Sequence, residues 1–213
     1  MKILKVEYVR YYEYMKKHQI IYVPGLHDQH LLNKQLTKLI PLFWKSFGFQ
    51  FHIVRPHWEE GTSFAPKLTY ILSHIDALLA KGDKVSLIGQ SAGGSAVMNA
   101  FSERKNNIHR VINVTGRLRK GEGVMPSFEM VTKYSPAFGE AILLFEEKNE
   151  PILTSQDRKK IMTIRPIRDV IVPAETVAVK GAYNIIAPMI GHSTGGGFIV
   201  MFYADKLRSF LNI

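Results

Sequence analysis

The sequence predicts an α/β fold, in which a mostly parallel sheet carries helices on both faces. Short apolar runs of strand length alternate along the chain with longer segments whose apolar residues recur at helical spacing. The apolar run 20–23 is followed directly by Pro24-Gly25. Proline and glycine favour turns, so this pattern predicts a buried strand that ends at residue 23. A repeated strand–helix–strand order is typical of parallel sheets. Parallel strands all begin at the same end of the sheet, so the chain must cross back to that end between strands, usually through a helix.

The expected elements follow one another without an internal repeat or a low-complexity linker. Residues 3–14 alternate charged with apolar or aromatic side chains, as a strand or hairpin near a sheet edge would. A helix is expected over residues 29–47, and Pro41 predicts a kink or a break in it. The other expected strands are 20–23, 49–54, 85–89, 108–114, 161–166 and 183–190, and the other expected helices are 64–80, 92–104 and 195–211.

Residues 116–158 interrupt this alternation. They contain several glycines and prolines and one helical segment near residues 137–149. Because the segment follows a strand, it could form a small cap or lid over the carboxyl edge of the sheet. The alternative is a long irregular connection with one ordinary helix. In either case residues 1–213 suit a single domain.

The composition limits the classes of function. The absence of cysteine excludes disulfides, zinc–thiolate sites and a cysteine nucleophile. The formal charge of +10 favours anionic partners, such as an anionic membrane surface. The basic residues are dispersed, however, and no nucleic-acid-binding motif accompanies them, so nucleic acid is not an expected partner. Neither a signal peptide nor a membrane span is evident, so we expect a cytoplasmic protein, whose oligomeric state the sequence does not predict.

The segment Gly89-Gln90-Ser91-Ala92-Gly93 has the pattern G-x-S-x-G between an expected strand and an expected helix. A serine at such a sharp turn takes a strained backbone conformation that exposes its hydroxyl at a helix N-terminus. Side chains two residues before and after it would clash, which explains both glycines. The alternative is the glycine-rich turn of a nucleotide-binding fold, but the glycine spacing does not fit a phosphate loop and no Walker lysine follows.

The segment Val85–Ala96 resembles the nucleophile elbow of the α/β-hydrolase family, in the form common among lipases and esterases. The resemblance implies an α/β-hydrolase fold in a compact form, with a short N-terminal region. It also implies a chain order of oxyanion loop, serine, acid and histidine. Ser91 would be the nucleophile.

His192 is the expected base, because a serine hydroxyl needs a base within hydrogen-bond reach. Of the eight histidines, His192 follows the elbow at a suitable distance, whereas His109 comes too soon. His192 lies directly after the apolar run 183–190 and before the last expected helix, where the family places its base. The alternative is a loop histidine without a catalytic role.

Asp169 is the expected acid, which would orient the base. It follows a strand and begins a segment that resembles the family's Asp-x-x-Val-Pro, and the nearby Arg165 and Arg168 would help to keep it ionised. Asp157 precedes its strand, so it would lie at the wrong edge of the sheet, and Glu175 lies near a helix start, where capping is a simpler role. The alternative for Asp169 itself is a turn-forming aspartate.

The resemblance also implies an oxyanion hole formed by backbone N–H groups. One donor would be Ala92, the residue after the nucleophile, and the other Leu26, in the loop after the first buried strand. His27 and Gln90 are candidates for contact with substrate. Asp28 could also contact substrate, or it could cap the following helix.

The family resemblance implies hydrolysis of a carboxylic ester or thioester through an acyl-enzyme on Ser91, with a small-molecule acyl substrate. No cofactor is expected. No metal is expected either, because the stretch 57–60, His-Trp-Glu-Glu, follows a strand in the manner of an exposed loop. The alternatives are a peptidase or amidase of the same fold, and a non-catalytic hydrolase-like protein that binds a partner through its basic surface.

Overall fold

The computed structural model describes residues 17–61 and 63–212. Six strands form one sheet in the order β2-β1-β3-β4-β5-β6, and every neighbouring pair is parallel. The predicted fold class is therefore confirmed, whereas the strand or hairpin predicted at 3–14 lies outside the described residues. The strands are β1 (His18–Val23), β2 (Phe49–Ile53), β3 (Lys84–Gln90), β4 (Arg110–Val114), β5 (Ile161–Arg168) and β6 (Tyr183–Ile190).

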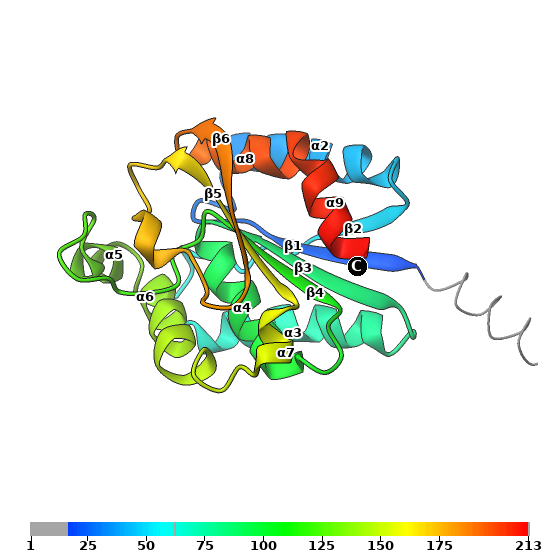
Figure 1. Ribbon diagram of the computed structural model, residues 1–213, viewed down its shortest axis with the longest axis horizontal. Coiled ribbons are helices and arrows are strands. Elements are labelled where there is room, and N and C mark those ends of the chain that lie inside the picture. The colour runs from blue at the N-terminus through cyan, green and yellow to red at the C-terminus, as the bar shows by residue number, and fades with distance from the viewer. Residues whose placement is uncertain (1–16, 62, 213) are drawn as a thin grey trace, which may run out of the picture.

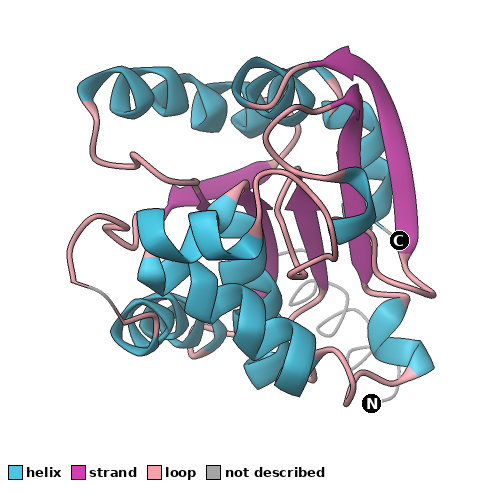
Figure 2. Cartoon of the chain, turned by 90° about the vertical axis from the view of Figure 1, so that its left-hand side faces the viewer, coloured by secondary structure: helices cyan, strands magenta, loops and turns pink. Residues whose placement is uncertain are grey.

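Helices cover both faces of the sheet, as Figures 1 and 2 show. On one face lie α3 (Ala65–Leu79), α4 (Ala92–Arg104) and α6 (Pro136–Leu143), and on the other lie α2 (Leu31–Lys45), α8 (Ser193–Phe202) and α9 (Ala204–Asn212). Successive side chains of a strand point to opposite faces. Ile21 of β1 accordingly joins one buried apolar cluster and Ile20 joins the other. The sheet is thus the middle layer between two cores.

Helix α2 continues through Pro41, so the break that the sequence allowed is absent. A proline inside a helix costs roughly 3 kcal/mol. Ile40 and Trp44, on either side of it, are 3% and 0% exposed. Burying side chains of this size stabilises by about 1.5–3 kcal/mol each. Packing on the sheet therefore offsets the cost of the proline.

The single helix predicted at 195–211 is wrong, because the structure has two helices, α8 and α9, that meet at Tyr203. Val200 before the bend and Leu207 after it are both fully buried in the same apolar cluster. Hydrophobic periodicity alone does not distinguish one helix from two that bend to follow one core.

The segment 116–158 contains more regular structure than the sequence predicted. It includes the exposed helix α5 (Phe128–Tyr134), α6, a π-helical stretch (Leu144–Asn149) and α7 (Ser155–Arg158). Two buried amides tie the segment to α4: Asn99 Nδ2 donates to the Ala141 carbonyl at 2.8 Å, and Asn149 Nδ2 donates to Asn99 Oδ1 at 2.7 Å. The stretch from α6 onward therefore packs beside α4 (Figure 1).

None of the helices in the described part of the chain is both long and apolar enough to cross a bilayer.

Candidate active site

Ser91 occupies a strained turn between the buried strand β3 and helix α4. Its backbone has φ 54° and ψ −125°, which a residue other than glycine adopts only at a cost. The two flanking glycines leave no room for a side chain. A Cβ on Gly89 would lie 2.2 Å from the Gly93 carbonyl oxygen, and one on Gly93 would lie 2.0 Å from the Val23 carbonyl oxygen. This crowding fixes the direction in which the serine hydroxyl points.

Gly93→Ala is expected to destabilise the fold by about 3 kcal/mol, because its methyl group would meet backbone that cannot move aside. Gly197→Ala in α8 is the matched control, since nothing lies within 4 Å of a Cβ at that position. Without such a clash, alanine stabilises a helix by about 0.5–1 kcal/mol relative to glycine. Urea denaturation of both variants measures the two shifts. Equal stability of the two variants would contradict this account of the turn.

The structure brings Ser91, His192 and Asp169 together in one hydrogen-bonded chain. Ser91 Oγ lies 2.7 Å from His192 Nε2, and His192 Nδ1 lies 2.8 Å from Asp169 Oδ2. The three residues follow β3, β6 and β5 respectively. Because the strands are parallel, their carboxyl ends share one edge of the sheet, and side chains far apart in sequence meet there.

The Asp169 carboxylate is buried, with 5% of its side chain exposed. Its second oxygen, Oδ1, accepts hydrogen bonds from the backbone N–H groups of Ile171 at 2.9 Å and Val172 at 3.0 Å. Burial by itself raises the pKa of Asp169, but the hydrogen bonds from His192 and these two amides outweigh it, so the net pKa is lowered. The group is therefore held as a carboxylate facing the imidazole.

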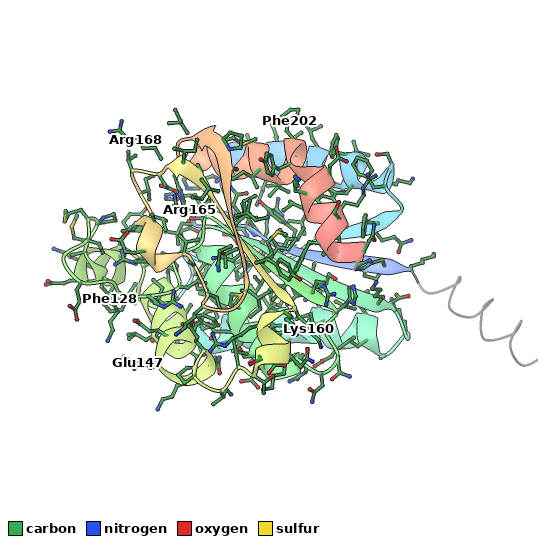
Figure 3. All side chains as sticks on the ribbon, viewed as in Figure 1. Phe128, Glu147, Lys160, Arg165, Arg168 and Phe202 are labelled. Atoms are coloured by element: carbon green, nitrogen blue, oxygen red, sulfur yellow. The ribbon has the colours of Figure 1, made fainter. Side chains whose placement is uncertain are left out.

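The two arginines expected to keep Asp169 ionised do not take that role. Arg165 donates to the Pro166 carbonyl at 3.1 Å, and Arg168 is exposed near the end of β5 (Figure 3). The groups that lower the Asp169 pKa are His192 and the two backbone amides. Closeness in sequence is therefore a poor guide to whether an arginine stabilises an aspartate. The long arginine side chain can turn away from the carboxylate.

The two rival carboxylates have other roles. Asp157 closes a capping box with Thr154 at the start of α7 and lies 3.2 Å from Lys105 Nζ. It precedes β5 and so belongs to the opposite edge of the sheet. Glu175 is exposed in a short 3-10 helix (Ala174–Thr176). The carboxylate that contacts His192 is that of Asp169.

The loop after β1 passes directly over the serine. A Cβ on Gly25 would lie 2.7 Å from Ser91 Cβ and 3.1 Å from Ser91 Oγ, so only glycine fits there. Leu26 follows in this loop, and Ala92 is the first residue of α4. Neither the Leu26 nor the Ala92 backbone N–H donates a hydrogen bond to another described residue. Sequence reasoning missed the role of Gly25, although a glycine close to the end of a strand can mark a close backbone approach.

Two of the remaining candidates make contacts within the protein. Gln90 Oε1 accepts a hydrogen bond from the buried Tyr22 hydroxyl, and a Cβ on Gly196 would lie 2.8 Å from Gln90 Nε2. Burial raises the pKa of Tyr22, which keeps its phenol a donor. Asp28 does not cap α2. It is 1% exposed and accepts from the backbone N–H groups of His57 at 2.9 Å and Trp58 at 3.4 Å.

His27 lies one residue beyond Leu26 and has a positive φ of 61°. Its backbone N–H donates to Glu59 Oε1 at 2.6 Å, and its ring Nε2 lies 2.8 Å from the Tyr134 hydroxyl of α5. This residue therefore joins the loop after β1, the loop after β2 and the segment 116–158.

The sequence matches no protein-family model and no curated protein. Solved structures do match. One from the study of the metagenome-derived lipolytic enzymes LipS and LipT has a TM-score of 0.62 at 11% identity, covering 92% of this chain and 94% of that one. Est1E from Butyrivibrio proteoclasticus has a TM-score of 0.58 at 14% identity, with coverages of 92% and 87%. A monoacylglycerol lipase from Paleococcus ferrophilus has a TM-score of 0.53 at 15% identity, with coverages of 91% and 94%. With its parallel sheet and its serine turn, the chain has the α/β-hydrolase fold.

Proposed function

We propose that the protein is a serine hydrolase that cleaves a carboxylic ester or thioester through an acyl-enzyme on Ser91. The observation that carries the proposal is the hydrogen-bonded chain from Ser91 through His192 to the buried Asp169, set on a strained strand–helix turn. A hydroxyl next to a base that a carboxylate orients is the arrangement of an activated nucleophile.

In the proposed mechanism, His192 Nε2 removes the Ser91 proton as Oγ attacks the substrate carbonyl carbon. The N–H groups of Leu26 and Ala92 stabilise the oxyanion that forms. Asp169 accepts a hydrogen bond from His192 Nδ1–H and so stabilises the imidazolium. His192 then gives its proton to the leaving alcohol or thiol, and a water molecule repeats the sequence on the acyl-enzyme.

The ester preference is supported by the structural neighbours, which include metagenome-derived lipolytic enzymes, a lipase-esterase related protein and a monoacylglycerol lipase. An amide substrate would use the same proton transfers, with an amine as the leaving group. Rates on p-nitrophenyl esters of graded chain length, set beside those on the matching anilides, would separate an esterase from a peptidase or amidase.

A fluorophosphonate probe tests the proposal, because it bonds covalently to an activated serine. We expect stoichiometric labelling of the native protein at Ser91, no labelling of Ser91→Ala, and unchanged labelling of Ser95→Ala. Ser95 is a fair control, since it is a fully buried serine of α4 that hydrogen-bonds to the Ala92 carbonyl. A native protein that resists the probe would favour the non-catalytic alternative, in which the basic surface binds a partner. Labelling that survives in Ser91→Ala would also reject the proposal.

A further inference from the structure

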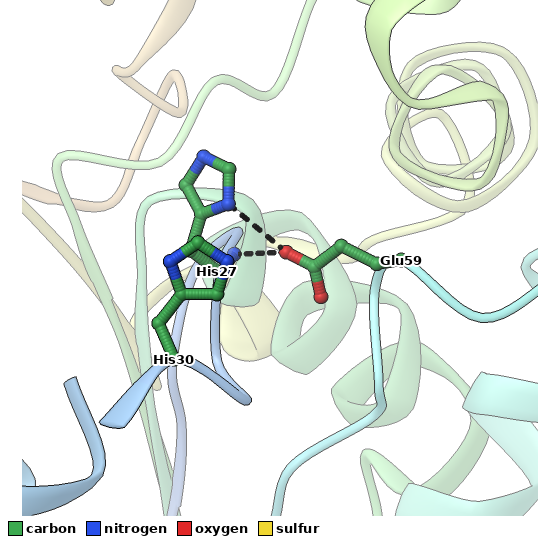
Figure 4. Close-up of side chains that lie close together, drawn as sticks. All are labelled: His27, His30 and Glu59. Carbon is green, nitrogen blue, oxygen red and sulfur yellow. Dashed lines mark hydrogen bonds and ion pairs between the residues drawn. The ribbon is translucent and has the colours of Figure 1, made fainter. Parts of the chain in front are cut away.

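Two histidines and a glutamate converge beside the loop that carries Leu26. The side chains of His27, His30 and Glu59 each place one possible ligand atom within 4.8 Å of the others (Figure 4). The two imidazole rings are 4.6 Å apart between centroids. His30 and Glu59 are exposed and His27 is half-buried, so solvent reaches the group from the side of His30 and Glu59.

The backbone around His27 is held in place from several sides. Its carbonyl accepts hydrogen bonds from the His30 N–H at 3.0 Å and from Asn33 Nδ2 at 2.8 Å. Its N–H donates to Glu59 Oε1 at 2.6 Å. The next residue, Asp28, ties the same loop to the backbone that precedes Glu59, at His57. The three side chains therefore face one another because of the fold, although 32 residues separate His27 from Glu59.

The two ring nitrogens of His27 have different environments. Nε2 lies 2.8 Å from the Tyr134 hydroxyl. Nδ1 is buried and makes no hydrogen bond, yet it lies 3.2 Å from Glu59 Oε1. In the tautomer whose Nε2–H donates to the Tyr134 hydroxyl, Nδ1 presents a lone pair to Glu59 Oε1, and a cation bound to both atoms removes the repulsion between them. The Tyr134 contact then corresponds to the outer hydrogen bond that orients a metal-bound imidazole.

We propose that His27 Nδ1, one imidazole nitrogen of His30 and the Glu59 carboxylate bind a divalent transition-metal ion, with Zn²⁺ as the best match. Two histidines and a glutamate, with water in the fourth position, form a known tetrahedral zinc set. Imidazole ligands disfavour Mg²⁺ and Ca²⁺, which prefer oxygen. Tetrahedral bonds of about 2 Å place ligand atoms roughly 3.3 Å apart. Rotation of the exposed His30 and Glu59 side chains can close the remaining distance.

The ion would stabilise the loop after β1 and would take no part in catalysis. None of the three ligands makes a hydrogen bond with Ser91, His192 or Asp169. His27 is instead joined to Leu26 by one peptide bond and to α5 through Tyr134. A bound ion would therefore fix the loop after β1 against the loop after β2 and helix α5. This inference does not depend on the proposed hydrolase activity.

Titration of the full metal-free chain with Zn²⁺, followed by calorimetry, tests the site. We expect one ion per chain, and a Co²⁺ spectrum typical of tetrahedral coordination. His30→Ala and Glu59→Gln should each weaken binding by at least about tenfold. Glu60→Gln and His74→Ala are the matched controls: Glu60 is the neighbouring carboxylate, paired with His57, and His74 is a half-buried histidine of α3 whose Nδ1 lies 2.9 Å from the Tyr70 carbonyl oxygen. Both controls should bind with native affinity.

The thermal midpoint gives a second measurement that does not rely on activity. Zn²⁺ should raise the midpoint of the native chain and of both controls, but not that of His30→Ala or Glu59→Gln. The midpoints of the metal-free variants show whether each substitution has changed the fold. No binding by the native chain, or native affinity in both His30→Ala and Glu59→Gln, would overturn the proposal. The second result would mean that the ion binds to scattered surface histidines.

Discussion

Replacing Ser91 or His192 by alanine is expected to lower kcat for ester hydrolysis by about 10⁶-fold. Ser91 Oγ is the atom proposed to bond to the acyl carbon, and His192 Nε2, 2.7 Å away, is the group proposed to take its proton. Without the imidazole the hydroxyl remains a poor nucleophile, so the two losses should be similar in size.

The double variant distinguishes a cooperating pair from two independent contributions. If Ser91 and His192 act in one step, Ser91→Ala/His192→Ala should be no slower than either single variant. Steady-state rates on a p-nitrophenyl ester, with Ser95→Ala as control, give the comparison. A loss in the double variant equal to the product of the single losses would show that the two residues do not act together.

Asp169→Asn is expected to lower kcat by about 10⁴-fold while leaving the fold intact. The native carboxylate accepts a hydrogen bond from His192 Nδ1, so Nε2 is left with its lone pair toward Ser91. An asparagine amide can donate at this position, which would put the proton on Nε2 and remove its capacity to accept from the serine. The probe-labelling rate should fall in parallel with kcat.

The two rival carboxylates are the controls for Asp169. Glu175→Gln should keep native kcat, because Glu175 is exposed in its 3-10 helix. Asp157→Asn should lower the urea midpoint, through loss of its capping box and its Lys105 ion pair, without changing kcat. If Asp169→Asn retains native kcat, or if Glu175→Gln loses it, the acid has been misassigned.

The order of elements was predictable because each depends on local patterns. Apolar runs and helical spacing located β3, α4 and β6 nearly to the residue. The glycines around Ser91 predict the turn, since the crowding that they relieve comes from α4, which the motif itself implies, and from the neighbouring strand β1. The positions of His192 and Asp169 after strands predict that their side chains lie near Ser91, because the carboxyl ends of parallel strands share one edge of the sheet, and the structure has this contact.

Features that depend on tertiary packing were not predictable. Pro41 fits inside α2 because the sheet buries its neighbours, and nothing in the local sequence reports that burial. The local sequence predicts substrate contact or helix capping for Asp28, whereas its carboxylate accepts a hydrogen bond from the backbone of His57, 29 residues later. The contact between His27 and Glu59 likewise joins two loops that are far apart in the sequence. The sequence of 57–60 alone predicts an exposed loop, because it contains no sign of His27 and His30, which the fold brings to Glu59.

The position of β6 at one edge of the sheet has a consequence for how the protein loses activity. Ser91 follows β3, which is paired on both sides and buried along most of its length. His192 follows β6, which pairs with β5 alone among the described strands and buries only Ala187. Segments with few buried contacts open more often than the whole molecule unfolds. We therefore expect the proposed base to belong to a less stable cooperative unit than the nucleophile, so that heat disables catalysis by opening the β6 edge while the centre of the sheet stays folded.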